Sequence, residues 1–148
     1  MPDIRAAITK DIPELATLYH AFFMEDGIDT GIQDITANLA AMLESPQARI
    51  WVCEDGGRLI GFTSATSTVG VEFGTAVEVE DLYLVPGSRG RGLSRPLLQT
   101  CEAWARDINA SEVFLVVTPE AEADQGLIAY YEKHGYIRSG RVILFKDS

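Results

Sequence analysis

Hydrophobic and polar positions along the chain change period several times, and each change predicts an element. Residues 3–8 alternate and favour a strand, whereas residues 11–27 carry apolar side chains at helical spacing. A second helix is expected over residues 32–43. Segments 48–55 and 58–67 predict a hairpin, because a Gly-Gly pair separates two strand-like runs.

The second half of the chain continues this alternation of strands and helices. A β-rich run at 75–85 precedes a helix at about 93–108, whose apolar side chains repeat every 3.6 residues. Residues 113–117 predict a buried strand, 122–135 a helix ended by a glycine, and 136–145 a closing hairpin. The predicted order is therefore βααβββαβαββ, which belongs to the α/β (α+β) fold class.

Length and composition fit one globular domain over residues 1–148, since 47% of the residues are hydrophobic and 23% are charged. No apolar run approaches the roughly 20 residues that span a bilayer, so no membrane association is expected. The first residues, "MPDIRAAITKDIPEL", resemble neither a signal nor a transit peptide. We therefore expect a cytoplasmic protein.

The net charge and the positions of the cysteines limit the kinds of ligand and metal that we expect this protein to bind. The formal net charge of −10 disfavours nucleic acid, which is bound by clustered Lys and Arg, and fits a cationic ligand better. Cys53 and Cys101 lie far apart and have no His or Cys neighbours at metal-ligand spacing. Neither a disulfide framework nor a metal site is predicted.

The segment "VPGSRGRGLSRPLLQ" at residues 85–99 has the chemistry of an anion site. It passes from a strand end into a helix start, where backbone N–H groups lack internal partners and the helix dipole is positive. Glycines allow close approach of a ligand, and Arg89, Arg91 and Arg95 reverse the sign of an otherwise acidic chain. We expect a phosphate-bearing ligand here.

This segment resembles the acetyl-CoA signature of the GNAT acetyltransferase family, Gln/Arg-x-x-Gly-x-Gly/Ala. Arg89 and Gly92 occupy the first two fixed positions, and Ser94 stands where Gly or Ala is usual. Downstream, "YYEKHGY" is similar to the family's Tyr-Glu-Lys-x-Gly-Phe segment, with Tyr131 on its fixed tyrosine. Asp124 replaces the asparagine that is frequent seven residues earlier, so no coenzyme contact is assigned to it.

The resemblance implies a GNAT-like fold, with a mixed, mostly antiparallel sheet of about six to seven strands flanked by about four helices. It also implies acetyl-CoA as cosubstrate, with its pantetheine arm against strand residues Leu84 and Val85. Main-chain N–H groups from about Arg91 to Ser94 are expected to hold the coenzyme diphosphate. The full set of cofactor-binding residues expected in this loop is Arg89, Gly90, Arg91, Gly92, Leu93 and Ser94.

Acetyl transfer to an amine needs a base for the ammonium proton and an acid for the departing thiolate. Strand alternation places Glu78 and Glu80 on one face and Asp81 on the other. The string "EDLYLVPGSRGRG" resembles the polyamine-type acetyltransferases of this family, which implies Glu80 as the base, with Glu78 as the second candidate. The family segment implies Tyr131 as the acid, whereas helical spacing alone leaves Tyr130 equally open.

Four acidic residues are expected to contact the acceptor, namely Glu25, Asp26, Glu72 and Glu78. The function so predicted is transfer of an acetyl group to a primary amine of a small cationic acceptor. A peptide or protein N-acetyltransferase and a non-catalytic acetyl-CoA-binding module remain open alternatives. A homodimer is common among resembling proteins and stays a possibility here.

Overall fold

The computed structural model describes all 148 residues, in two compact units, Met1–Val116 and Val117–Ser148. The single domain expected over residues 1–148 stays a prediction. The α-helices and strands of the first unit are β1 (Asp3–Ala6), α1 (Ile12–Glu25), α2 (Ile32–Glu44), β2 (Ala48–Asp55), β3 (Arg58–Gly70), β4 (Gly74–Leu84), α3 (Ser94–Asp107) and β5 (Glu112–Leu115). Their order is the one predicted.

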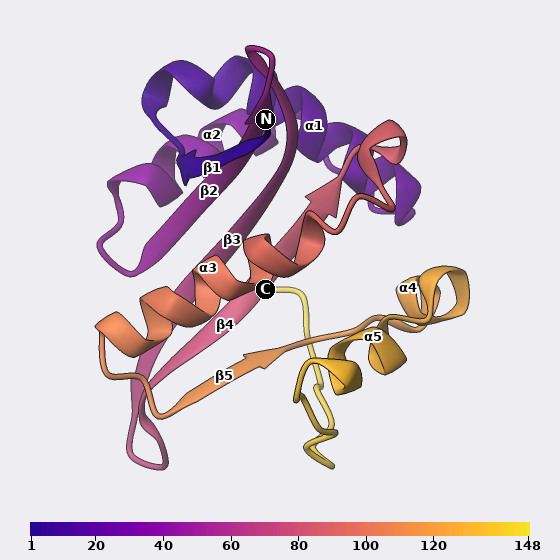
Figure 1. The fold of residues 1–148 in the computed structure, drawn as a ribbon. Coiled ribbons are helices and arrows are strands. Elements are labelled where there is room, and N and C mark those ends of the chain that lie inside the picture. Colours follow the sequence, from indigo (N-terminus) through magenta and orange to yellow (C-terminus); the bar gives the residue numbers. More distant parts are fainter. The chain divides into compact units, whose positions relative to one another are not determined.

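One five-stranded sheet in the order β1-β2-β3-β4-β5 forms the centre of this unit. Neighbouring strands are antiparallel except β4 and β5, which are parallel, so the predicted mixed, mostly antiparallel sheet is confirmed. Helices α1 and α2 cover one face and α3 covers the other (Figure 1). None of the helices combines the length and the apolar character that crossing a bilayer requires.

Strand alternation sends successive side chains into two separate cores. Val52 and Tyr83 pack under α1 and α2, whereas their neighbours Cys53 and Leu84 pack with Leu97 of α3. The apolar stripe predicted for α3 is buried at its centre, because a 3.6-residue period keeps one side of a helix against the sheet.

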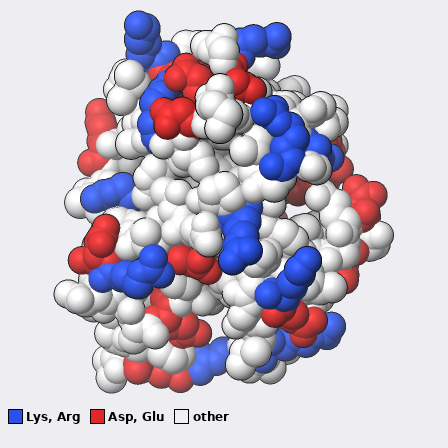
Figure 2. Space-filling view, in the orientation of Figure 1, with Lys and Arg blue, Asp and Glu red and all other residues white.

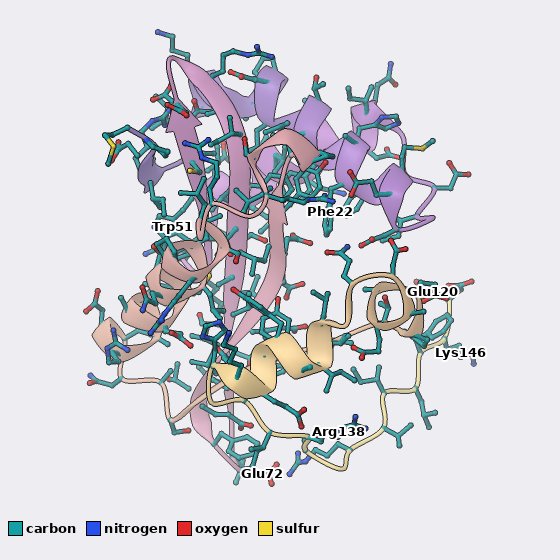
Figure 3. All side chains as sticks on the ribbon, turned by 45° about the vertical axis from the view of Figure 1, so that its right-hand side comes forward. Phe22, Trp51, Glu72, Glu120, Arg138 and Lys146 are labelled. Atoms are coloured by element: carbon teal, nitrogen blue, oxygen red, sulfur yellow. The ribbon has the colours of Figure 1, made fainter.

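An aromatic cluster fills the core beneath α1. Tyr19 stacks on Phe62 of β3, with ring centroids 3.9 Å apart. Phe22 makes an edge contact with Phe62 and packs against Tyr83 of β4 at 5.1 Å between centroids. Figure 3 shows Phe22 at the underside of α1, among the side chains between helix and sheet. Such rings bury large apolar areas, so they fix the C-terminal half of α1 over β4.

The second unit departs from the prediction in its helix. Residues 122–135 were expected to form one helix, but the structure has α4 (Pro119–Gln125) and α5 (Leu127–Lys133). Gly126 separates them in the left-handed conformation, with φ of 60°, which interrupts the helical hydrogen-bond ladder. The structure thus has five α-helices instead of about four.

The predicted closing hairpin at 136–145 is also wrong, because no strand follows β5. Gly140 has a φ of 77° and the backbone N–H of Arg141 donates to Ser139 Oγ, but residues 136–145 form no regular turn or strand. The apolar side chains of Val142, Leu144 and Phe145 are exposed. A two-stranded hairpin is marginally stable unless a further strand or a helix covers its apolar face, which explains why local alternation overestimated the strand count.

Gly61 of β3 allows β3 and β4 to approach closely just before the end of β4. A Cβ at this position would lie 2.6 Å from both the Leu84 side chain and the Tyr83 carbonyl oxygen. We expect Gly61→Ala to lower the free energy of unfolding by about 1–3 kcal/mol, as other overpacked cores do. Chemical denaturation measures this loss. The matched control is Gly70→Ala on the same strand, where no atom lies within 4 Å; equal loss in both variants would contradict the close approach.

Candidate active site

Strand β4 contains a β-bulge at Glu80. Ser64 of β3 pairs with Asp81 and Ala65 pairs with Val79, so Glu80 is an extra residue with no opposite partner. A bulge reverses the alternation beyond it. The expectation that Asp81 lies on the face opposite Glu78 is therefore wrong.

Side-chain contacts place all three β4 carboxylates on the face that α1 and α2 cover. Thr66 of β3 pairs with Glu78 and donates its hydroxyl to Glu80 Oε2 at 2.7 Å. The Tyr19 hydroxyl of α1 donates to Asp81 Oδ2 at 2.9 Å. We call Glu78, Glu80 and Asp81 the acidic cluster.

Asp81 is the most firmly held member of the acidic cluster. Its Oδ2 accepts hydrogen bonds from the Tyr19 hydroxyl and from Ser64 Oγ, at 2.9 and 2.7 Å. Burial nevertheless raises the pKa of Asp81 above its ordinary value, because desolvation of the carboxylate outweighs these two hydrogen bonds. The bulge and its carboxylate are thus anchored from two directions.

Glu78 is the member of the acidic cluster whose ionisation is most perturbed by its neighbour Glu80. Burial, the charge of Glu80 and a hydrogen bond between the two side chains raise the pKa of Glu78 to about 7. A nearby negative charge disfavours ionisation of the Glu78 carboxyl, in the same direction as its desolvation. A carboxyl whose pKa lies near neutral pH suits general acid or base catalysis.

The raised pKa of Glu78 predicts a pH-dependent effect of Glu78→Gln on stability. The folded chain holds this proton up to about pH 7, whereas the unfolded chain releases it near 4.5. Stability is therefore present below pH 4.5 and is lost as the pH rises through 7. Glutamine does not ionise, so we expect Glu78→Gln to raise Tm by about 2–4 °C at pH 8 and by less at pH 4.

Thermal unfolding at the two pH values, with Glu44→Gln as a control, measures this difference. Glu44 ends α2 and is exposed. A gain that is no larger at pH 8 than at pH 4 would show that Glu78 ionises normally in the folded chain.

Beyond the bulge, β4 has an open edge. Its pairing with β5 ends at Val79, so β5 does not cover Glu80 to Leu84. The N–H of Val85 donates to Ile60 of β3. Because neighbouring residues direct their N–H and C=O groups to opposite edges, Leu84 directs its groups to the open edge. The Leu84 N–H thus faces an extended ligand at this edge, whereas the Leu84 carbonyl accepts a hydrogen bond from Arg89 and the Val85 N–H is committed to β3.

The loop after β4 has the properties of an anion site. We call residues 90–93 the cofactor loop. Gly90 and Gly92 adopt φ of 79° and 73°, which favour glycine, and no backbone acceptor receives the N–H groups of the loop. Helix α3 follows at Ser94, so its positive dipole end adjoins the loop. Arg91 contacts Asp55 only at 3.4 Å and remains partly exposed. These donors fit a coenzyme diphosphate.

Arg89 is bound within the chain. Its Nε donates to the Leu84 carbonyl at 3.0 Å, and its Nη2 donates to Glu25 Oε2 at 2.8 Å. Glu25 also accepts a hydrogen bond from the Tyr83 hydroxyl at 3.0 Å. Burial, followed by this contact with Glu25, raises the pKa of Tyr83. Both Arg89 and Glu25 thus hold structural contacts, and their predicted ligand roles stay predictions.

The other predicted site residues are distributed unevenly. Asp26 caps α1, and its charge contributes to the raised pKa of Asp81. Glu72 lies in the β3–β4 turn, six residues before Glu78, and Figure 3 shows it at the far end of these strands from Phe22. The structure therefore does not bring Glu72 to the acidic cluster.

Tyr131 belongs to the second unit. It lies in α5, is buried, and contacts the rings of Tyr130 and Tyr136 at centroid distances of 5.2 and 5.7 Å. Its role as acid stays a prediction.

Sequence reasoning missed two tyrosine hydroxyls that contact carboxylates of the site. Tyr19 donates to Asp81, and Tyr83 donates to Glu25. Both residues have apolar neighbours at core spacing, so a periodic pattern assigns them to packing. Their buried hydroxyls need hydrogen-bond partners, which is the signal that could have identified them.

The charged surface is mixed. On the face shown in Figure 2, Lys and Arg side chains lie singly or in small groups between Asp and Glu. That face presents no continuous basic surface of the kind that binds nucleic-acid phosphates.

Comparison with known proteins assigns the family. The sequence profile of the Acetyltransferase (GNAT) family matches residues 12–136. The uncharacterized N-acetyltransferase YhfO of Bacillus subtilis is 29% identical over 137 residues, which cover 90% of this chain and 89% of YhfO.

Solved structures share the fold. A predicted acetyltransferase from Clostridium acetobutylicum, solved with acetyl-CoA, has a TM-score of 0.83 at 19% identity and covers 99% and 96% of the two chains. The aminoglycoside N-acetyltransferase AAC(6')-Iy, solved with CoA, has a TM-score of 0.84 at 18% identity and covers 99% and 95%. The predicted enzyme class and cosubstrate are thereby confirmed. The chain belongs to the GNAT acetyltransferase family and is an acetyl-CoA-dependent N-acetyltransferase.

Proposed function

We propose that this enzyme acetylates a primary amine of a small, cationic acceptor, with Glu80 as the general base and Tyr131 as the general acid. The observation that carries the proposal is the acidic cluster at the β4 bulge. It lies where β4 leaves β5, and its last member, Asp81, stands four residues before Val85 on the strand that leads to the cofactor loop at Gly90. A cation-attracting site thus adjoins the strand edge available to the cosubstrate.

The acidic cluster suits an ammonium ion. Glu80 is exposed, and Glu78 and Asp81 lie beside it on the same face of β4. Several carboxylates gathered on one face attract a cation and orient it before reaction. A polyamine or an aminoglycoside carries more than one ammonium group and fits such a site better than a neutral peptide. The similar fold of AAC(6')-Iy, an aminoglycoside N-acetyltransferase, agrees with this acceptor class.

Each proposed residue has one task. Bound acetyl-CoA supplies an acetyl group activated as a thioester. The N–H groups of the cofactor loop hold the diphosphate, and the Leu84 backbone orients the pantetheine arm at the open edge. Glu80 takes the proton of the acceptor ammonium, so the amine becomes a nucleophile. Tyr131 supplies a proton to the departing thiolate.

The acceptor class is tested by measuring thiol release from acetyl-CoA with polyamines, aminoglycosides, single amino acid amines and an N-terminal peptide. We expect acceleration by the polycations, and weaker acceleration at high salt because surface charge attraction is screened. Acceleration by the peptide alone would contradict a small cationic acceptor. No acceleration by any cationic amine would contradict the proposal as a whole.

The acid role predicts different behaviour of two adjacent tyrosines. Tyr131→Phe is expected to lower kcat by about 100-fold, the usual contribution of a proton donor, while the affinity for coenzyme A is unchanged. Tyr130→Phe removes the same hydroxyl from the preceding residue of α5 and is the matched control. Steady-state kinetics of both variants, with the amine that the wild-type enzyme acetylates fastest, measures the two kcat values. If Tyr130→Phe lowers kcat and Tyr131→Phe does not, the acid has been assigned to the wrong ring.

A further inference from the structure

Three side chains from three elements close a ring beside the cofactor loop. Glu25 ends α1, Tyr83 lies near the end of β4, and Arg89 directly precedes the cofactor loop. Both Glu25 carboxylate oxygens are used, Oε1 by the Tyr83 hydroxyl and Oε2 by Arg89. The Arg89 guanidinium lies over the Tyr83 ring, 5.5 Å from its centroid, which closes the ring. We call these three residues the anchor ring.

The anchor ring leaves Arg89 little freedom to reach a ligand. Besides Glu25 and the Tyr83 ring, its Nε donates to the Leu84 carbonyl. A guanidinium held by a carboxylate, a carbonyl and an aromatic face is fixed in position, because movement breaks all these contacts together. The contacts of Arg89 therefore favour a structural task over a phosphate contact.

The two glycines after Arg89 make the cofactor loop flexible, so a fixed residue before them helps to order it. Gly90 and Gly92 give the cofactor loop large conformational freedom, since glycine has the widest range of backbone angles. A flexible loop loses entropy when it binds, and that loss weakens affinity unless the loop is ordered beforehand. Ser88 helps, since its N–H donates to the Val85 carbonyl. The anchor ring fixes the last residue before the glycines.

We propose that Glu25 is a positioning residue for coenzyme A: by holding Arg89 within the anchor ring, it presets the N–H groups of the cofactor loop for the diphosphate. The inference rests on the proposed cofactor site and is independent of the acceptor. In this proposal Glu25 supports coenzyme A binding, and Arg89 holds the cofactor loop in place. Glu25 acts through Arg89 and touches neither substrate.

Coenzyme A titration by calorimetry tests this role in Glu25→Gln, Arg89→Gln and the double variant. Each single variant is expected to bind coenzyme A about tenfold more weakly, as the loss of one charge-assisted hydrogen bond entails. The double variant should be no weaker than the weaker single variant, because both changes open the same ring. Asp29→Asn removes the same charge four residues after Glu25 from an exposed position and should leave affinity unchanged.

Two further measurements separate positioning from general stability. The ion pair of Glu25 and Arg89 is partly exposed, with side chains 33% and 41% accessible, so its loss should move Tm by only a few degrees. In steady-state assays the KM for acetyl-CoA should rise about tenfold while kcat stays within about twofold. A variant damaged throughout its fold would lose kcat as well.

The outcomes are distinguishable. Unchanged coenzyme A affinity in Glu25→Gln would overturn the positioning role. Tighter binding would overturn it too, because it would mean that Glu25 competes with the diphosphate for Arg89. If Gly92→Val also leaves the affinity unchanged, the proposed cofactor site itself has failed. If these variants bind coenzyme A more weakly as expected but the enzyme acetylates none of the amines, only the acceptor proposal is refuted.

Discussion

Glu80→Gln is expected to lower kcat/KM for the acetylated amine by about 10²–10⁴-fold, the range found when a general base is removed. Glutamine keeps an oxygen that can accept the Thr66 hydroxyl, which lies 2.7 Å from Glu80 Oε2, so the bulge should persist. Coenzyme A affinity should stay unchanged, because the cofactor loop is untouched. Kinetics at saturating acetyl-CoA, with calorimetry on the same samples, measure both quantities.

Glu78→Gln serves as the internal comparison for Glu80→Gln. If Glu80 is the base, Glu78→Gln should lower kcat/KM for the amine by less than about tenfold. A loss confined to Glu78→Gln, with Glu80→Gln near wild type, would exchange the two roles. Loss in neither variant would remove both from the mechanism.

Gly92→Val is expected to weaken coenzyme A binding by about 100-fold or more, corresponding to the loss of two or more backbone hydrogen bonds to the diphosphate. Gly92 has a φ of 73°, which a β-branched residue adopts only under strain. The strained loop should turn its N–H groups away from a common point, and the valine side chain should obstruct approach of the ligand. Calorimetric titration of coenzyme A measures the loss.

The matched control for Gly92→Val is Gly57→Val in the β2–β3 turn. Gly57 also has a positive φ, 81°, and a Cβ added at either glycine would meet no atom within 4 Å. Both substitutions should therefore cost similar stability, whereas only Gly92→Val should impair coenzyme binding. Equal affinity in the two variants would show that the loop strain does not matter for the ligand.

Periodicity predicted most of the first unit because each helix buries one continuous face and successive strand side chains alternate between two cores. Alternation found β2 at residues 48–55 with the bounds that the structure has. It failed at Glu80, since a single bulged residue changes no local composition yet reverses the faces of Glu78 and Asp81 relative to each other. The break at Gly126 is local, because this glycine adopts the left-handed conformation, whereas the C-terminal hairpin failed because such a pair needs a further strand or helix over its apolar face.

Some features of the candidate site could be predicted from local sequence, and others could not. The cofactor loop could be predicted, because Arg and Gly at a strand-to-helix junction carry their chemistry in the local sequence. The anchor ring could not, because Glu25 and Arg89 are 64 residues apart. Likewise the hydrogen bond from Tyr19 to Asp81 spans 62 residues, and only the packing of α1 on β4 creates it. Local patterns locate reactive groups, whereas the fold determines which of them meet.

Backbone amide chemical shifts during a coenzyme A titration test the central claim most directly, since each N–H reports its own environment. We expect the largest shifts on the amides of the cofactor loop and Ser94, followed by Leu84 at the open edge of β4. Saturable binding in which these amides stay unmoved, with the largest shifts elsewhere in the chain, would contradict a diphosphate held by this loop.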